Sequence, residues 1–353
     1  MEKKFSLIIF LTLVFVGQKS FAQKSPNFSG YIETTYNYNL SNSNTNALRS
    51  YDARANQILL NNVHLNVSGN PSDKVSYTTE FDFGTDAAVH GLLHQAGTGG
   101  TPIGVDVQEA YMTYAFSDKF KFTGGKFVTF EGIEVIEGPF NPTISRGYLY
   151  GLAEPYTHVG GYLTFVASDK MDFKLGVVNG WDLLIDNNPD KTIISRLGMN
   201  LGDPLAFVLS YITGIEQANS KNWRNSFDLT GVTKVIPGVA LNFQTNYGTE
   251  TFTDSTGDTH AKWFGFTLQP IVALTDNIDL GLRAEYFADD DGVRTGVANL
   301  KAFNFTITPA LKFDGLLFRL EYRLDNSNKE IFVEKNKVVK NSNTISLGVS
   351  CLL

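Results

Sequence analysis

Apolar and polar residues alternate in segment after segment from about residue 28 to the end of the chain. In the first segment Phe28, Ile32, Tyr36 and Leu40 fall on even positions, and residues such as Glu33 fall on odd ones. A period of two is typical of a β-strand with one apolar and one polar face. We predict sixteen strands, near residues 28–40, 57–68, 74–83, 105–115, 120–130, 158–166, 172–180, 192–200, 205–213, 223–234, 239–249, 260–273, 278–287, 301–312, 316–324 and 343–353.

The gaps between these strands alternate in length. Every second junction is a terse turn signal, such as Pro237-Gly238 or Asp314-Gly315, and long polar stretches such as 41–56, 84–104, 131–157 and 325–342 lie between. This order places tight turns at one end and long loops at the other end of an up-and-down barrel. A soluble β-sandwich would not order its loop lengths in this way.

The predicted fold class is therefore all-β: a transmembrane antiparallel barrel of about 16 strands with short periplasmic turns and long extracellular loops. A sheet spans a membrane only when it closes, because every backbone group must be paired internally. If a weak strand is misread, such as the one that contains Gly124 and Gly125, the count becomes 14 or 18. In the second strand Leu59 is assigned to the lipid face with Val63 and Leu65. Aromatic residues near strand ends are expected in the two interfacial belts: Tyr36, Tyr38, Tyr114, Trp181, Trp223 and Trp263.

Residues 1–22 read as a signal peptide, which leaves 23–353 as a single barrel domain. Lys3 and Lys4 precede an apolar run to Val16, and Ser20-Phe21-Ala22 forms a small-residue cleavage site. The run is too short to span a bilayer, and no stop-transfer pattern that would make it an uncleaved anchor follows. Removing three lysines and one glutamate from 29 basic and 36 acidic residues leaves 26 and 35, a net charge of -9.

Composition excludes several other classes of protein. Only 18% of the residues are charged and the balance is acidic, so a nucleic-acid partner is not expected. The chain has one cysteine, Cys351, and therefore no intrachain disulfide or thiolate metal cluster. No 18-residue apolar window follows residue 22, which excludes a transmembrane helix.

The histidines do not form an obvious catalytic or metal site. No G-x-S-x-G or H-E-x-x-H motif occurs. His90 and His94 are spaced as a metal pair on a short loop helix would be, but no nearby carboxylate completes the set. Asp289-Asp290-Asp291-Gly292 lacks the twelfth-position Glu of a calcium loop, because Leu300 stands there. We expect no enzyme activity, no cofactor and no metal.

The chain resembles the putative β-barrel porin-2 (OmpL-like) outer-membrane proteins of Bacteroidetes and other Gram-negative bacteria. The resemblance covers nearly the whole chain after residue 22. The segments that carry it are Gly125-Lys126-Phe127, residues 141–148, residues 154–160, Asn179-Gly180-Trp181-Asp182, Asp186-Asn187-Asn188, residues 282–287, residues 291–296 and residues 319–323. It implies a porin in the outer membrane, which allows passive diffusion of small hydrophilic solutes and ions.

Sixteen strands enclose a lumen wide enough for water, so that what narrows the lumen decides what passes. In general porins a third loop of this length folds into the lumen, and here the loop at about 131–157 is the candidate constriction. Its charged candidates are Glu131, Glu134, Glu137, Arg146 and Glu154, with Arg146 expected to face the pore or to pin the loop. By parity, the wall candidates are Glu33, Glu80, Glu109, Arg196, Arg283, Glu285, Arg319, Glu321 and Arg323. An acidic loop against a basic wall would set a transverse field, although the same charges could simply pair to make the wall rigid.

Two further functions stay open at this stage. One is a substrate-selective channel, which would need a ladder of like charges or an aromatic slide along the pore. The other is a closed barrel whose loops bind a surface partner. The expected partners are outer-membrane lipid and lipopolysaccharide, small polar solutes or ions, and the barrel assembly machinery, with a homotrimer left open.

Overall fold

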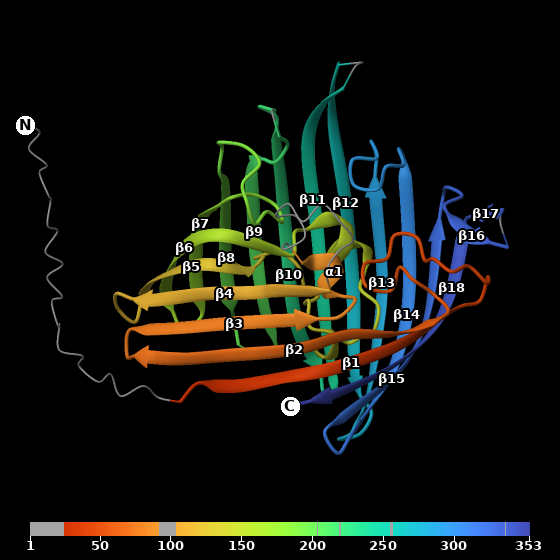
Figure 1. Cartoon of the computed structure of the whole chain (residues 1–353), viewed down its shortest axis with the longest axis horizontal. Coiled ribbons are helices and arrows are strands. Elements are labelled where there is room, and N and C mark those ends of the chain that lie inside the picture. Colours follow the sequence, from red (N-terminus) through yellow and green to blue (C-terminus); the bar gives the residue numbers. More distant parts are fainter. Residues whose placement is uncertain (1–24, 92–103, 203, 219, 255–256, 336) are drawn as a thin grey trace, which may run out of the picture.

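The computed structural model describes residues 25–353 except for residues 92–103, 203, 219, 255–256 and 336. The predicted signal peptide and His94 lie outside the described residues. Sixteen antiparallel strands form one closed barrel, in which β1 pairs with β2 on one side and with β18 on the other (Figure 1). These are β1 (Asn27–Asn39), β2 (Gln57–Ser72), β3 (Val75–Phe83), β4 (Val105–Ala115), β5 (Phe120–Val128), β6 (Thr157–Ser168), β7 (Met171–Val178), β8 (Thr192–Asn200), β9 (Leu205–Ile215), β10 (Trp223–Ile236), β11 (Val239–Asp254), β12 (Gly257–Ala273), β13 (Ile278–Asp289), β14 (Leu300–Phe313), β15 (Leu316–Ser327) and β18 (Asn341–Leu352).

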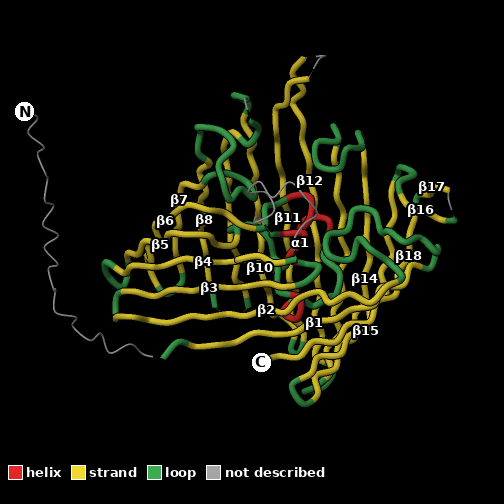
Figure 2. The backbone as a smooth tube through the Cα atoms, viewed as in Figure 1, coloured by secondary structure: helices red, strands yellow, loops and turns green. Residues whose placement is uncertain are grey.

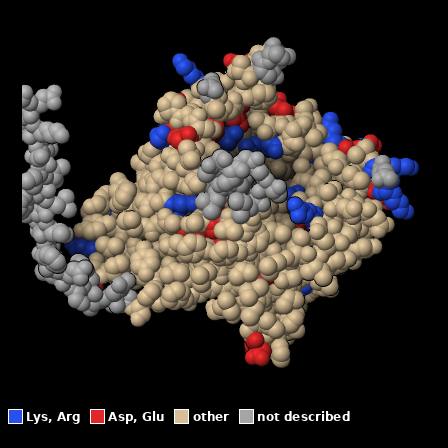
Figure 3. All heavy atoms as spheres, viewed as in Figure 1, with Lys and Arg blue, Asp and Glu red and all other residues tan. Residues whose placement is uncertain are grey.

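The alternation of residues decides which side chains face the barrel interior. In β1, Glu33, Thr35 and Asn37 are buried inside, whereas Phe28 and Ile32 are exposed on the outer surface. Figure 3 shows that charged side chains are sparse over much of the outer surface in that view and gather toward the loop end. An outward apolar surface around a polar interior is the arrangement of a barrel in lipid. No helix among the described residues is long and apolar enough to span a bilayer.

Backbone geometry explains two features of the barrel, a tight turn and a strand that contains two glycines. Asp314 and Gly315 both have positive φ, 50° and 77°, as a two-residue hairpin turn requires. Gly125, with φ of 138°, lies so close to β4 that a Cβ atom there would be 2.1 Å from the backbone oxygen of Ala110. The strand with the paired glycines is therefore an intact member of the barrel, and the count is 16.

Four features differ from the sequence-based expectation. A bulge at Asn61 reverses the faces of the first part of β2, so Leu59 is buried inside and Ile58 and Leu60 are exposed. Residues 250–254 and 257–259, expected in a loop, extend β11 and β12 as a tall hairpin. The last loop contains a small extra hairpin, β16 (Phe332–Glu334) with β17 (Lys337–Val339).

The fourth difference concerns the aromatic belt. Trp181 and Trp263 are 8% and 1% exposed and pack against each other edge to face, with ring centroids 6.4 Å apart. The Arg294 guanidinium lies 5.0 Å and 5.3 Å from these two rings. Both tryptophans therefore belong to the packed loop end of the barrel rather than to the lipid interface, whereas Trp223 is exposed as expected.

Candidate functional site

Loop 3, residues 129–156 between β5 and β6, lies inside the barrel and bonds to strands on several sides of it. Gly132 N donates to Asp228 of β10 at 3.2 Å, and Ile133 N donates to Gln244 of β11 at 3.3 Å. Farther along the loop, Ile144 N donates to Glu321 of β15 at 2.6 Å. The loops contain three short helical segments, drawn in red in Figure 2: α1 (Ala87–His90), η2 (Gly138–Phe140) and η3 (Leu149–Ala153).

Three arginines of the barrel wall hold the backbone oxygens of loop 3. Arg283 donates to Ser145 O at 2.6 Å, and also pairs with Glu134 of the loop at 2.8 Å. Arg319 donates to Gly138 O at 3.1 Å and pairs with Glu33 of β1. Arg323 donates to the carbonyl oxygen of Arg146 at 2.5 Å. All three guanidinium groups are buried, so the wall of β13 to β15 anchors the loop and does not present free cations to a pore.

Two wall carboxylates hold the backbone N–H groups of the same segment. Glu285 accepts from Tyr148 N at 2.7 Å and Leu149 N at 2.9 Å. Glu321 accepts from Ile144 N and from Ser145 N. Hydrogen bonds from backbone N–H groups to charged acceptors are strong in a site that is closed to bulk water. The arginines of this wall therefore bind carbonyl oxygens of loop 3, and the glutamates between them bind its backbone N–H groups.

Arg146 is a buried cross-link within loop 3. Its guanidinium donates to Val135 O at 3.0 Å, Ile136 O at 2.7 Å and Ile144 O at 2.9 Å. Its Cζ lies 5.1 Å and 5.7 Å from the ring centroids of Tyr51 and Tyr150. Arg146 thus ties the two arms of the loop to each other and to loop 1, residues 40–56.

Replacing Arg146 by alanine is expected to loosen loop 3 without unfolding the barrel. Three carbonyls would lose their donor, two of them buried, at a cost of about 1–3 kcal/mol for each that no water reaches. Limited proteolysis and the noise of single-channel currents report the loosening. Arg54→Ala, at an exposed arginine of loop 1, serves as the control; equal protease resistance of the two variants would contradict the cross-link.

On the opposite side loop 3 leaves a gap, which we call the acidic chamber. It is a cavity of about 180 Å³ between loop 3 and the inner face of β3 and β4. Six glutamates line it, two from the strands and four from loop 3: Glu80, Glu109, Glu131, Glu134, Glu137 and Glu154. Tyr150, Pro155 and Tyr156 complete its walls. The loop carboxyls expected at the constriction thus meet two of the expected wall residues here.

Two more cavities continue from the acidic chamber toward the short turns. A cavity of about 350 Å³ shares Glu109 and Glu131 with the chamber, and we call it the aromatic cavity because Tyr111, Phe127, Phe130 and Tyr162 line it. It in turn shares Lys174 and Arg196 with a cavity of about 640 Å³ at the turn end. Arg196, an expected wall residue, pairs there with Asp172 and keeps 21% of its side chain exposed. The three cavities form a series along one side of loop 3.

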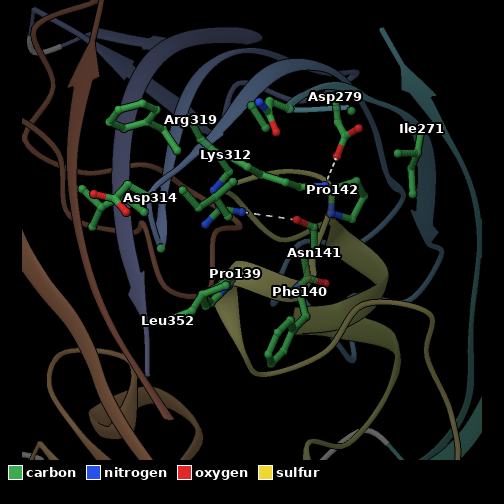
Figure 4. A pocket seen from close by; sticks show the side chains of 17 residues that line it. Pro139, Phe140, Asn141, Pro142, Ile271, Asp279, Lys312, Asp314, Arg319 and Leu352 are labelled. Atoms are coloured by element: carbon green, nitrogen blue, oxygen red, sulfur yellow. Dashed lines mark hydrogen bonds and ion pairs between the residues drawn. The ribbon is translucent and has the colours of Figure 1, made fainter. Parts of the chain in front are cut away.

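A separate recess lies on the anchoring side of loop 3. It measures about 570 Å³ and lies between Pro139–Pro142 and the turn ends of β13 to β15. Figure 4 shows Arg319 directed at Asn141 and the Lys312–Asp279 pair on its wall. The anchored loop segment forms one of its walls, so this recess faces the turn end and is not part of the series of cavities.

Loop 1 and loop 2, the loop between β3 and β4, contribute residues to buried clusters that the sequence did not reveal. Arg49 of loop 1 pairs with Asp52 of the same loop and with Asp325 of β15. Asp325 also binds Arg323 and Tyr148. His90 of loop 2 and His64 of β2 both contact Asp82, at 2.9 Å and 2.7 Å. A single spacing pattern could not reveal these sets, because their members come from distant parts of the chain. In the described part of the chain no group of three or more His, Cys, Asp or Glu is placed to hold a metal ion.

Comparison with known families decides the relationship of the chain. The profile of the family "putative beta-barrel porin-2, OmpL-like" matches residues 25–352. The chain belongs to that family. It is an outer-membrane porin of a Gram-negative bacterium, a channel for passive diffusion.

Solved outer-membrane proteins share the fold of this porin at low sequence identity. The anion-selective porin from Comamonas acidovorans is 8% identical with a TM-score of 0.66, over 93% of this chain and 99% of that one. The channel DcaP of Acinetobacter baumannii is 11% identical with a TM-score of 0.65, over 93% and 97%. OmpT of Vibrio cholerae in its trimer form is 14% identical with a TM-score of 0.61, over 93% and 99%. No curated protein matches the sequence.

Proposed function

We propose that solutes and ions cross this porin through the acidic chamber and the two cavities that follow it, with a preference for cations. One observation carries the proposal: six glutamates line the gap that loop 3 leaves, and of these six Glu134 pairs with a wall arginine, Arg283. The other two wall arginines, Arg319 and Arg323, are bound to backbone oxygens of loop 3. Rings of carboxylates favour cations in a pore. In this proposal the electric field of the carboxylates acts at the chamber. It takes the place of the transverse field between loop and wall that the sequence suggested.

Planar-bilayer recording of the chain from residue 23 tests this proposal. Stepwise open channels are expected, with a reversal potential in a salt gradient that has the sign of cation preference. Glu80→Gln with Glu137→Gln should reduce that preference, because both carboxylates line the chamber. A folded barrel that inserts but carries no current would overturn the conduction path, and an anion-selective reversal potential would overturn the role of the chamber.

The cation preference is expected to increase with pH. Burial raises the pKa of the Glu131 carboxyl well above its usual range, and the negative charge of Asp228 raises it further. The same two causes raise the pKa of Glu154. Both groups are neutral below their raised pKa values and become charged as the pH rises through them, so the chamber gains negative charge. Reversal potentials between about pH 5 and about pH 9 check this. The double variant Glu131→Gln, Glu154→Gln should remove this part of the pH dependence, and a cation preference that falls with pH would contradict it.

The porin assembles as a homotrimer in this proposal. Strand β7 has eight residues, which at about 3.3 Å each and a tilt of about 45° cover roughly 19 Å of the ~25 Å apolar band. The adjacent strand β8 has nine residues, and so does β5, which the twelve-residue β6 separates from β7. A partner subunit against this low wall would shield it from lipid, and OmpT of Vibrio cholerae has a trimer form. Sedimentation of the protein in detergent checks the trimer, and a monomer would contradict it.

The same proposal includes the path of export. Residues 1–22 are removed as a signal peptide, the barrel assembly machinery inserts residues 23–353, and the loop end meets lipopolysaccharide. The sequence of the first 22 residues and the apolar outer surface support it. N-terminal sequencing of the outer-membrane protein should begin at Gln23.

A further inference from the structure

The aromatic cavity, midway along the proposed path, has the composition of a binding site rather than of a plain water channel. Tyr162 meets Phe127 edge to face with centroids 4.8 Å apart, and meets Phe130 in the same way at 5.1 Å. Tyr111 completes the lining with Thr129 and Thr230. Phe130, Tyr162 and Tyr111 are only partly buried, so their rings are accessible from the cavity.

Two cations stand together at the turn end of this cavity. Lys174 of β7 is directly opposite Arg196 of β8 in the strand register. Like charges directly opposite each other destabilise a sheet, so such a pair needs a compensating charge. Asp172 pairs with one nitrogen of Arg196. The Lys174 ammonium has no hydrogen-bond or ion-pair acceptor among the described residues, and lies 5.2 Å from the ring centroids of Phe130 and Tyr162.

Two carboxyl groups stand at the loop end of the same cavity. Glu109 accepts from Val128 N at 2.7 Å through one oxygen. Glu131 is 4% exposed and receives the Ser226 hydroxyl on Oε2, at 2.9 Å. Its other oxygen, Oε1, is buried and has no hydrogen-bond partner in the described part of the chain. The cavity therefore has an acceptor pole toward loop 3, a donor pole toward the turns and aromatic rings between them.

We infer that the aromatic cavity is a binding site for zwitterionic solutes that carry a flat ring, that is, aromatic amino acids and short peptides that contain one. The carboxylate of the solute would lie against Lys174 and Arg196, its ammonium would donate hydrogen bonds to carboxyl oxygens of Glu109 and Glu131, and its ring would lie on Phe130 and Tyr162. A neutral sugar would leave the unpaired lysine charge without an anion, and an inorganic ion would leave the rings unused. This inference rests on the proposed conduction path and names a class of solute for it.

Current blockage by four small solutes tests the inference in the full porin. L-phenylalanine should interrupt the single-channel current of the wild-type protein at lower concentration than glycine, phenylacetate or phenethylamine, each of which lacks the ring or one charge. Lys174→Met, which keeps the apolar stem, should weaken blockage by phenylalanine about tenfold or more, because a hydrogen bond to a charged group is lost. Phe130→Leu should weaken it in the same direction.

Lys312→Met is the matched control, because Lys312 lies in the separate recess and pairs with Asp279. Equal blockage by phenylalanine and glycine, or unchanged blockage in Lys174→Met, would overturn the site. Blockage by phenylacetate as strong as that by phenylalanine would overturn the preference for zwitterionic solutes. Calorimetric titration with phenylalanine measures binding without current, so that a silent barrel overturns the conduction path while the titration still decides the inference.

Discussion

Alanine at Asp325 is expected to destabilise the barrel by about 3–5 kcal/mol, since it leaves buried cations without their partner. Asp325 accepts from Arg49 at 2.6 Å, from Arg323 Nε at 2.9 Å and from the Tyr148 hydroxyl at 2.5 Å. It thereby joins β15, loop 1 and loop 3 in one buried cluster. Equilibrium unfolding in urea, followed by tryptophan fluorescence in lipid vesicles, measures the loss.

Asp279→Ala is the control for this prediction. Its partner Lys312 keeps 57% of its side chain exposed, and exposed ion pairs contribute about 1 kcal/mol or less. A loss in Asp325→Ala no larger than in Asp279→Ala would contradict the cluster as a support of the loops.

The double variant Glu285→Ala, Glu321→Ala is expected to release loop 3 from the wall and to enlarge the open channel. Four backbone N–H groups, those of Ile144, Ser145, Tyr148 and Leu149, lose their acceptors, at about 1–3 kcal/mol for each group that stays buried. The freed segment should sample the lumen, so we expect larger and unsteady single-channel currents and protease cleavage within loop 3.

Glu250→Ala is the matched control, because Glu250 is a buried wall carboxylate that pairs with Arg224 and not with loop 3. Both proteins must first show the heat-modifiable band of a folded barrel in gel electrophoresis. Steady currents of wild-type size in the folded double variant would contradict the anchoring role of the wall.

The strands were predictable because their signals are local. Alternation places Glu33, Thr35 and Asn37 inside β1 without any knowledge of the partners, and Asp314-Gly315 defines a turn from two residues. Alternation fails where a strand contains a bulge. The extra residue at Asn61 reverses the faces of its strand, and nothing in the local sequence pattern indicates the bulge. Alternation therefore predicts the wrong face for Leu59.

The sequence could predict some of the residues of the candidate site, but not the contacts that they make. Parity puts Arg283, Arg319 and Arg323 on the inner face. Their contacts depend on which carbonyl of loop 3 each one meets, and those carbonyls lie more than a hundred residues away in the sequence. Lys174 was not singled out, because a lone lysine in a strand gives no signal. Its role depends on Arg196 across the strand pair and on rings that four other segments supply, namely β4, β5, loop 3 and β6.

The most direct test of the conduction path uses the single cysteine of the chain, Cys351. In a Cys351→Ser background, Glu137→Cys places a thiol in the acidic chamber and Thr143→Cys places one in the anchored segment of loop 3. A small charged thiosulfonate reagent is added while single-channel current is recorded. The path along the chamber predicts that the reagent changes the current of Glu137→Cys and leaves Thr143→Cys unaffected. A response of Thr143→Cys alone, or channels that never open, would contradict it.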